Sequence, residues 1–239
     1  RLGNGFGRVN VGGATYTYGG NDIQPPAFTA WKWTSDPVMT VNDKTGDYYY
    51  CCLAAPDAST NSSAIARGRF TAGVFAFDSV FIVRTAPNAA AFLDKQWIAA
   101  DSTNGFLYVT NTTFTATDQI DFYRSTDGGR TWSLPVQISN AATDNGNVQG
   151  SRPAVGPNSE LYVVWYAADA TTDEDDIRFR VSLDKGVTVD ANNGLLTPAK
   201  FNQQFGTGAP AFNRARGVNF PTIAVDRQNV PQRGGLYIS

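Results

Sequence analysis

The sequence predicts an all-β fold made of repeated four-stranded antiparallel sheets, and three observations support this prediction. Aromatic residues make up 13% of the 239 residues, and aromatic side chains favour strands over helices. Apolar and polar residues alternate with a period of two in many short segments, whereas no segment of ten or more residues shows the 3.6-residue period of a helix. In addition, one order of elements recurs along the chain.

The recurring unit is an apolar strand, a tight turn rich in Asp, Asn and Gly, and a second strand with a Tyr near its start. The copies begin at Asp36, Lys95, Arg152 and Phe220. Their tyrosines are Tyr49, Tyr108, Tyr162 and Tyr237. The spacings of 59, 54 and 75 residues are unequal in the way that loop insertions produce.

A second pair of strands follows the middle two copies, in IDFYRSTDGGRTWSLPVQIS from Ile120 and DIRFRVSLDKGVTVD from Asp176. The corresponding hairpin of the first unit is expected in FAFDSVFIV, from Phe75. Each unit is thus a predicted four-stranded meander, and such units arranged around a channel make a β-propeller. The predicted blades are residues 27–93, 94–140, 141–200 and 201–239, with a Gly-rich strand segment at 1–26.

The last predicted blade is incomplete, because the sequence reaches only the second strand of that unit. The chain is therefore expected to hold about three and a half blades of a ring of six or more blades. Either further residues of a longer protein or another chain of a larger assembly would complete this ring.

Composition excludes several partners and chemistries. The net charge is −2 without a long run of one sign, so neither nucleic acid nor an anionic membrane surface is expected as a partner. No apolar run approaches the roughly 20 residues of a transmembrane helix. His is absent, which removes the commonest general base and zinc ligand, and no cofactor is expected. Cys51 and Cys52 are expected to be buried on opposite faces of one strand.

Two hairpins share the pattern Ser-x-Asp-x-Gly-x-Thr at the same place in their units. The residues are Ser125, Asp127, Gly129, Thr131 and Trp132 in the first copy, and Ser182, Asp184, Gly186 and Thr188 in the second. Asp and Ser side chains bond to nearby backbone groups in turns, and Gly supplies a positive φ. The two aspartates are therefore predicted to hold their turns, and equivalent turns of neighbouring blades lie too far apart for an acid and base pair.

The pattern resembles the Asp-box, or BNR repeat, of sialidase-like β-propellers of the bacterial exported type. This resemblance covers roughly residues 30–239 and implies an extracellular, cell-surface or periplasmic location. It also implies recognition of glycan or of a surface protein. Asp-box propellers include non-hydrolytic proteins, so the resemblance does not assign an activity.

Five polar segments are expected as long loops on the propeller face opposite these hairpins, where binding is most expected. They are residues 54–68, 111–119, 139–152, 167–176 and 198–219. Candidate ligand-binding residues on this face are Arg67, Arg152, Arg214 and Arg216. Arginine pairs well with carboxylates, and the sialidase resemblance implies arginines that hold a sugar carboxylate. The Arg-Ile-Pro signature of sialidases is absent, so no catalytic residues are assigned.

Asp173, Asp175 and Asp176 are weak candidates for a Ca²⁺ site, because they concentrate oxygen donors in one loop. Their spacing is not that of a dedicated calcium loop, and a solvated acidic loop is the alternative. Three functions stay open: a propeller that recognises glycan or protein, a sialidase-type glycoside hydrolase with residues outside this segment, and a structural subunit of a surface assembly.

Overall fold

The computed structural model confirms the all-β class. It describes residues 36–55, 57–140, 147–167, 176–189, 220–228 and 230–239, and the backbone of strand segments at 9–11, 14–16, 32–33, 174–175 and 201–202. These residues form strands, turns and bends. None of the described segments is a helix that could cross a membrane.

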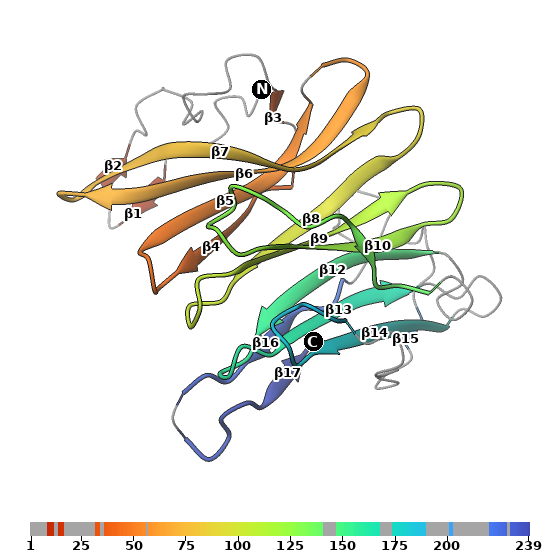
Figure 1. Ribbon diagram of the computed structural model, residues 1–239. Helices are drawn as coiled ribbons and strands as arrows, with labels where there is room; N and C mark the ends of the chain where they lie inside the picture. Colours follow the sequence, from red (N-terminus) through yellow and green to blue (C-terminus); the bar gives the residue numbers. More distant parts are fainter. Residues whose placement is uncertain are drawn as a thin grey trace.

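Three large antiparallel sheets lie side by side as the blades of a partial β-propeller (Figure 1). The first blade contains β3 (Lys32–Trp33), β4 (Val38–Asn42), β5 (Asp47–Ala55), β6 (Thr60–Thr71) and β7 (Val74–Pro87). The second contains β8 (Phe92–Ala100), β9 (Leu107–Phe114), β10 (Gln119–Ser125) and β11 (Val136–Gln137). The third contains β12 (Val148–Val155), β13 (Leu161–Ala167), β14 (Glu174–Ser182) and β15 (Phe201–Asn202).

Two smaller sheets complete the described strands. The strands β16 (Ile223–Val225) and β17 (Leu236–Ile238) form one of them and begin a fourth blade. The strands β1 (Val9–Val11) and β2 (Ala14–Tyr16) form the other. In the three large blades and in β16–β17, the first two strands pair as the repeat predicts, because each repeat Tyr lies opposite the preceding strand.

Apolar clusters between the blades form the core. Tyr49, Cys51 and Ile65 of the first blade belong to one cluster with Leu107 and Val109 of the second blade. A second cluster joins the second and third blades and includes the fully buried Trp165. Radial packing of this kind leaves each blade covered on the face that meets its neighbour.

The two cysteines are buried as expected. Cys51 belongs to the cluster that faces the second blade, and Cys52 belongs to a separate cluster within the first blade. Both thiols are free, and burial is the main cause that raises the pKa of each. The adjacent pair therefore packs as two small apolar side chains on opposite faces of β5.

The third and fourth strands of the first blade were predicted wrongly. FAFDSVFIV is not a hairpin but lies entirely within β7, because the chain reverses earlier, at Ala72 and Gly73. These two residues have φ values of 50° and 80°, the backbone that a tight two-residue hairpin needs. The expected loop at 54–68 is likewise mostly strand, since β6 begins at Thr60 and pairs with both β5 and β7.

Two further boundaries differ from the sequence predictions. The segment after Thr188 does not form the expected fourth strand of the third blade within the described residues. Instead β15, beyond the predicted blade limit at residue 200, pairs with the start of β14. The expected loop at 111–119 also shortens to residues 115–118, because β9 continues to Phe114.

Candidate functional site

The two ends of the propeller axis differ in how their loops are held. We call the turn end the one that carries the turns between strands 1 and 2 and between strands 3 and 4 of each blade. We call the opposite end, where the first strand of each blade begins, the loop end. Neighbouring turns between strands 1 and 2 bond to one another. These bonds join Asn42 to the Gly105 carbonyl (3.3 Å), the Asp43 amide to Ser102 (3.0 Å), Asn104 to Ser159 (3.4 Å) and Arg233 to the Pro157 carbonyl (3.4 Å).

The hairpins at residues 125–132 and 182–189, which we call the Ser-Asp-Gly turns, also lie at the turn end. In the first, Asp127 accepts bonds from Ser125 Oγ (2.9 Å), the Thr131 amide (3.0 Å) and Thr131 Oγ1 (2.6 Å). Ser125 Oγ in turn accepts from the Gly129 amide at 2.9 Å. Each bond stays within the turn, which is the geometry of a turn-holding aspartate.

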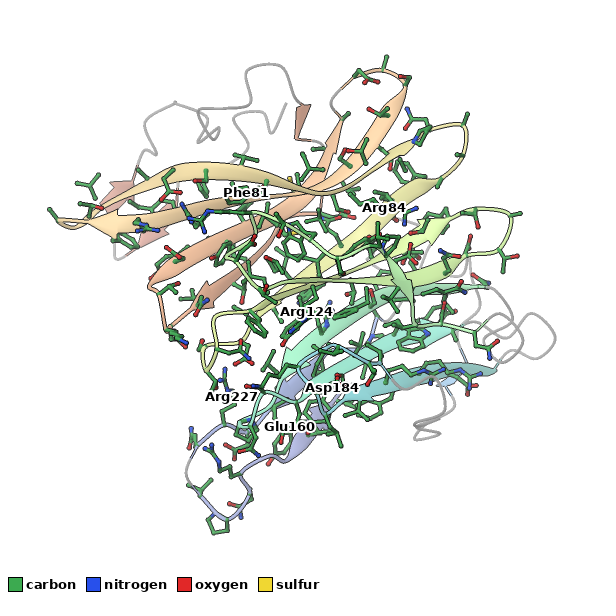
Figure 2. The ribbon with its side chains drawn as sticks, viewed as in Figure 1. Phe81, Arg84, Arg124, Glu160, Asp184 and Arg227 are labelled. Atoms are coloured by element: carbon green, nitrogen blue, oxygen red, sulfur yellow. The ribbon has the colours of Figure 1, made fainter. Side chains whose placement is uncertain are left out.

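The second Ser-Asp-Gly turn repeats these bonds. Asp184 accepts from Ser182 Oγ (2.7 Å) and from the amide and hydroxyl of Thr188 (2.9 and 2.6 Å). Bonds from Thr188 and Ser182 lower the pKa of Asp184 to about 2. Figure 2 labels Asp184 on this turn and Arg124 on the neighbouring second blade. The carboxylate of Asp184 therefore accepts its hydrogen bonds from its own hairpin, as the carboxylate of Asp127 does.

Toward the loop end, a residue of positive φ, which we call the kink residue, stands at an equivalent position in or just before the first strand of each large blade. The kink residues have φ values of 57°, 49° and 69°, and they are Asp36, Lys95 and Gly150. The strand register shows that these positions are equivalent. In each blade, the residue two positions after the kink residue pairs with the residue two positions after the repeat Tyr. Those pairs are Val38 with Cys51, Trp97 with Thr110, and Arg152 with Val164.

The kink residues of the first two blades form an ion pair with each other, and the backbone of both is strained. A positive φ suits Gly, whereas a non-Gly residue in a sparsely populated backbone region costs on the order of 1 kcal/mol or more. Asp36 and Lys95 nevertheless occupy it, and Lys95 Nζ lies 2.7 Å from Asp36 Oδ2. Gln96, 1% exposed, donates from its side-chain amide to the backbone carbonyl of Asp36. Strain of this kind concentrates at binding and catalytic sites.

A second carboxylate, Asp94, belongs to the same cluster. Its Oδ1 lies 3.9 Å from Lys95 Nζ, and its Oδ2 accepts from Gln149 Nε2 at 3.0 Å. Burial is the main cause that raises the pKa of Asp94, and the charge of Asp36 raises it further against the opposing effect of Lys95. Two carboxylates therefore share one ammonium group where the first and second blades meet.

Arg152 stacks on Trp97, which follows Lys95 by two residues in β8. Its guanidinium carbon lies 3.9 Å from the centroid of the Trp97 ring, and burial lowers the pKa of Arg152. Among the described residues, no carboxylate lies within 4 Å of this guanidinium. The half-buried guanidinium of Arg152 therefore presents several N–H donors next to the apolar ring of Trp97.

The structure places one of the four predicted arginines on Trp97, two residues after Lys95. Arg152 was expected in a loop before the inner strand but lies within β12. Arg67 was placed wrongly: it lies within β6 toward the turn end, bonded to Asp78 (2.9 Å) and Ser79 (3.0 Å), because the expected loop is a strand. Arg214 and Arg216 lie outside the described residues.

The weak calcium candidates are not brought together within the described part of the chain. Asp173 and the side chain of Asp175 lie outside it, and Asp176 pairs with Arg178 at 3.0 Å. No group of three or more His, Cys, Asp or Glu side chains is placed to bind a metal ion among the described residues.

Sequence reasoning missed most of the loop-end cluster. The missed residues are Asp36, Asp94, Lys95, Trp97 and Gln149. One signal was available, since Asp36 and Lys95 stand at the same position of the aligned repeats and carry opposite charges. Their positive φ values, however, cannot be read from a segment that otherwise alternates as a strand.

Comparison with known proteins supports the fold. No protein-family model matches the chain, and no curated protein matches it in sequence. An α-L-arabinanase from Penicillium chrysogenum matches with a TM-score of 0.57 at 12% identity, over 92% of this chain and 63% of that chain. Zg3597, a family 117 glycoside hydrolase from the marine bacterium Zobellia galactanivorans, matches with a TM-score of 0.50 at 10% identity, over 87% and 68%.

A third match is the Hadza microbial sialidase Hz136, with a TM-score of 0.49 at 14% identity, over 67% of this chain and 36% of that chain. The chain thus spans between about a third and two thirds of the length of these three proteins. At such identities the similarity to the arabinanase and to Zg3597 defines the fold alone, a β-propeller of the kind found in glycoside hydrolases. The assignment of the Ser-Asp-Gly turns as Asp-boxes rests on their sequence pattern.

Proposed function

We propose that this chain recognises a glycan at the loop end of the propeller, through the cluster of Asp36, Lys95, Asp94 and Arg152 stacked on Trp97. The observation that carries the proposal is the strained Asp36–Lys95 pair, in which two non-Gly residues hold charged side chains in a backbone conformation that favours Gly. A location outside the cytoplasm belongs to the same proposal and is supported by the sialidase-like sequence pattern.

The chemistry of the cluster suits a sugar. Carboxylates accept bonds from hydroxyl groups, ammonium and guanidinium groups donate to them, and an indole ring packs against the apolar face of a pyranose or furanose. At the turn end, the aspartates of the Ser-Asp-Gly turns already bond within their own turns, and Arg67 and Arg69 already pair with Asp47 and Asp78. The glycoside hydrolase folds among the similar structures support a glycan as the ligand class.

The proposal can be tested by calorimetric titration with a panel of neutral arabino-oligosaccharides and sialylated oligosaccharides. Arg152→Ala and Trp97→Ala should each weaken binding by about tenfold or more, as loss of roughly 1.4 kcal/mol implies. The matched control is Arg124→Ala, because Arg124 stacks on Phe106 at 4.7 Å but lies toward the turn end. Equal effects of Arg124→Ala and Arg152→Ala would contradict a loop-end site.

A second candidate function is glycoside hydrolysis, favoured by the shared position of Asp36 and Asp94. Both carboxylates lie within 4 Å of Lys95 Nζ, so they cannot be farther apart than the sum of the two distances. This upper bound agrees with the separation of about 5 to 10 Å that paired carboxylates use in glycosidases. The raised pKa of Asp94 is the property expected of a general acid.

Hydrolysis is tested with a panel of chromogenic arabinosides, galactosides and sialosides. Asp94→Asn and Asp36→Asn should each lower kcat by about a hundredfold or more if these groups transfer protons. Asp118→Asn serves as the control, since burial also raises the pKa of Asp118, which lies in the loop after β9. If the protein binds a glycan but turns over no substrate of the panel, the hydrolysis proposal is contradicted and the recognition proposal stands.

A further inference from the structure

The outermost strand of the first blade is long and has one unpaired edge (Figure 1). This strand, β7, has 14 residues, whereas β11 and β15, at the same place in the second and third blades, have two described residues each. Among the described residues β7 pairs with β6 alone, and no residue of β7 is bonded to a segment outside the described ranges. Blades follow one another face to face, so this edge lies outside the contacts that build the ring.

Hydrogen bonds determine which residues of β7 direct their backbone groups toward β6, which we call inward, and which direct them away, which we call outward. Just past the strand, the Asn88 amide donates to the Ser59 carbonyl at 2.8 Å, so residue 88 faces inward. Inward and outward residues alternate in an antiparallel ladder. Pro87, which has no N–H group, therefore faces outward, as proline on an edge strand does. At the other end, the two-residue turn at 72–73 makes Val74 face inward.

Two β-bulges interrupt this alternation within β7. Residues 78 and 79 together stand opposite Arg67, and residues 83 and 84 together stand opposite Ser63. Counting from the turn through both bulges arrives at an inward Asn88, in agreement with its bond. The outward residues have no backbone partner on β6, and they are Phe75, Phe77, Val80, Ile82, Thr85 and Pro87.

This pattern is symmetric about Phe81. The outward residues stand one, four and six positions to either side of Phe81, and the two bulges stand at equal distances from it. A second β7 strand that runs in the opposite direction, with its own Phe81 opposite this one, therefore places outward residues opposite outward residues and a bulge opposite a bulge. Because opposite residues of an antiparallel ladder exchange N–H and C=O bonds, this register lets the two edges bond to each other.

The charges of β7 agree with the same symmetry. Asp78 and Arg84 are its two charged residues, and each stands three positions from Phe81. In the register centred on Phe81, Asp78 of each copy therefore lies opposite Arg84 of the other, an arrangement that stabilises antiparallel pairs. Within the chain, Asp78 also pairs with Arg67 (2.9 Å) and Arg84 with Asp121 (2.6 Å). The opposite charges thus favour this register without requiring either side chain to leave its bond.

We propose that two copies of this chain associate through β7, in an antiparallel pair centred on Phe81 that joins the two first blades into one continuous sheet. The bulges identify the second copy as the occupant. A straight strand cannot follow an edge with two bulges, whereas an identical strand in the opposite direction matches both of them. Such an interface uses the same surface on both copies and forms a closed two-fold dimer. The dimer is independent of glycan recognition at the loop end.

Sedimentation equilibrium of the full chain measures this association. The parent chain should form dimers that dissociate on dilution. Val80→Pro removes an outward N–H group, which leaves the bonds of β7 to β6 in place, and should weaken dimerisation by about tenfold or more. The matched control is Gln137→Pro on the edge strand β11, because the bond from the Ile138 amide to the Ile120 carbonyl (2.9 Å) makes Gln137 face outward as well. The control should dimerise as the parent chain does.

Two outcomes of this experiment would overturn the proposal. One is a parent chain that stays monomeric at every concentration. The other is a folded Val80→Pro variant that dimerises as tightly as the parent chain.

A second measurement determines the register with the edge backbone intact. Pulsed electron paramagnetic resonance measures the distance between spin labels on the two copies of Thr85→Cys, and separately of Ala76→Cys; the native thiols are buried. Thr85 lies opposite Phe77 of the partner copy, so its two labelled sites should be about 27 Å apart along the strand. Ala76 lies opposite Ala86 of the partner copy, which gives about 34 Å. A register shifted by two residues toward the turn would reverse the order of the two distances, and dimers with neither distance would show that β7 is not the interface.

Discussion

The turn end and the loop end of this propeller use the same residue types for opposite purposes. At the turn end, Asp127 and Asp184 satisfy backbone groups of their own hairpins, and the residues of positive φ, both Gly and non-Gly, lie within turns. At the loop end, Asp36 and Lys95 occupy positions of positive φ themselves, and Asp94 is held in a partly buried cluster. The comparison teaches that aspartates can close a turn from within one hairpin at one end, and can share an ammonium group between two blades at the other.

The largest expected effect tests the packing at the turn end. A Cβ added at Gly129 would lie 2.5 Å from Ile65. Gly129→Val should therefore lower the free energy of unfolding by about 3 kcal/mol or more, since it combines overpacking with backbone strain. Gly46→Val is the matched control: its φ of 71° is similar, but no atom lies within 4 Å of an added Cβ. Urea unfolding should show a smaller loss for Gly46→Val. Equal losses would mean that Gly129 is needed for its backbone alone.

The next effect is pH dependence of opposite sign at the two ends. The folded pKa of Asp184, about 2, lies below the usual value of about 3.9, so the contribution of Asp184 to stability is complete above pH ~4 and is lost as the pH falls toward 2. The pKa of Asp94 is raised, so the ionisation of Asp94 removes stability as the pH rises through that raised value. Because Asp184 is exposed, its share is a few tenths to about 1 kcal/mol.

Urea unfolding between pH 2 and pH 7 measures both signs. Asp184→Asn should reduce the loss of stability below pH 4, whereas Asp94→Asn should become more stable relative to the parent chain as the pH increases. The two difference curves should slope in opposite directions. If the two difference curves slope in the same direction, the expected opposite pH dependence of Asp184 and Asp94 is wrong.

The smallest expected effect concerns the strained pair at the loop end. Lys95→Gly relieves the positive φ of residue 95 but loses an ion pair between side chains that are 34% and 29% exposed. Exposed pairs contribute about 0 to 1 kcal/mol, so the free energy of unfolding should change by less than about 1 kcal/mol in either direction. Glycan binding should nevertheless be lost. A large loss of stability would show that Lys95 is structural.

Local patterns of the sequence predicted the blades because they repeat. The spacing of the tyrosines identified paired strands 1 and 2 in each unit, and the Ser-x-Asp-x-Gly pattern located two hairpins at the turn end. The first blade was harder, because its reversal at Ala72 and Gly73 lacks Asn or Asp, and its polar segment NSSAIARG resembles a loop although it is a central strand. Tertiary pairing on both sides overrides that weak propensity.

The residues of the candidate site were harder to predict from the sequence than the fold was. Arg152 was found because it precedes an apolar strand, but its partner Trp97 comes from another blade, 55 residues away. The ion pair of Asp36 with Lys95 likewise joins residues from two blades, at kinks that no residue preference reveals. Contacts between blades depend on how the sheets pack, and one strand's own pattern does not contain that information.

The adjacent buried thiols of Cys51 and Cys52 can serve as two alkylation probes of the first blade. One thiol faces the interface with the second blade and the other faces the opposite side, and neither is exposed by more than 1%. Alkylation of each thiol therefore requires a different opening motion, and the ratio of the two rates compares how readily the two sides of β5 open. A peptide that carries both sites allows that ratio to be read in one mass spectrum.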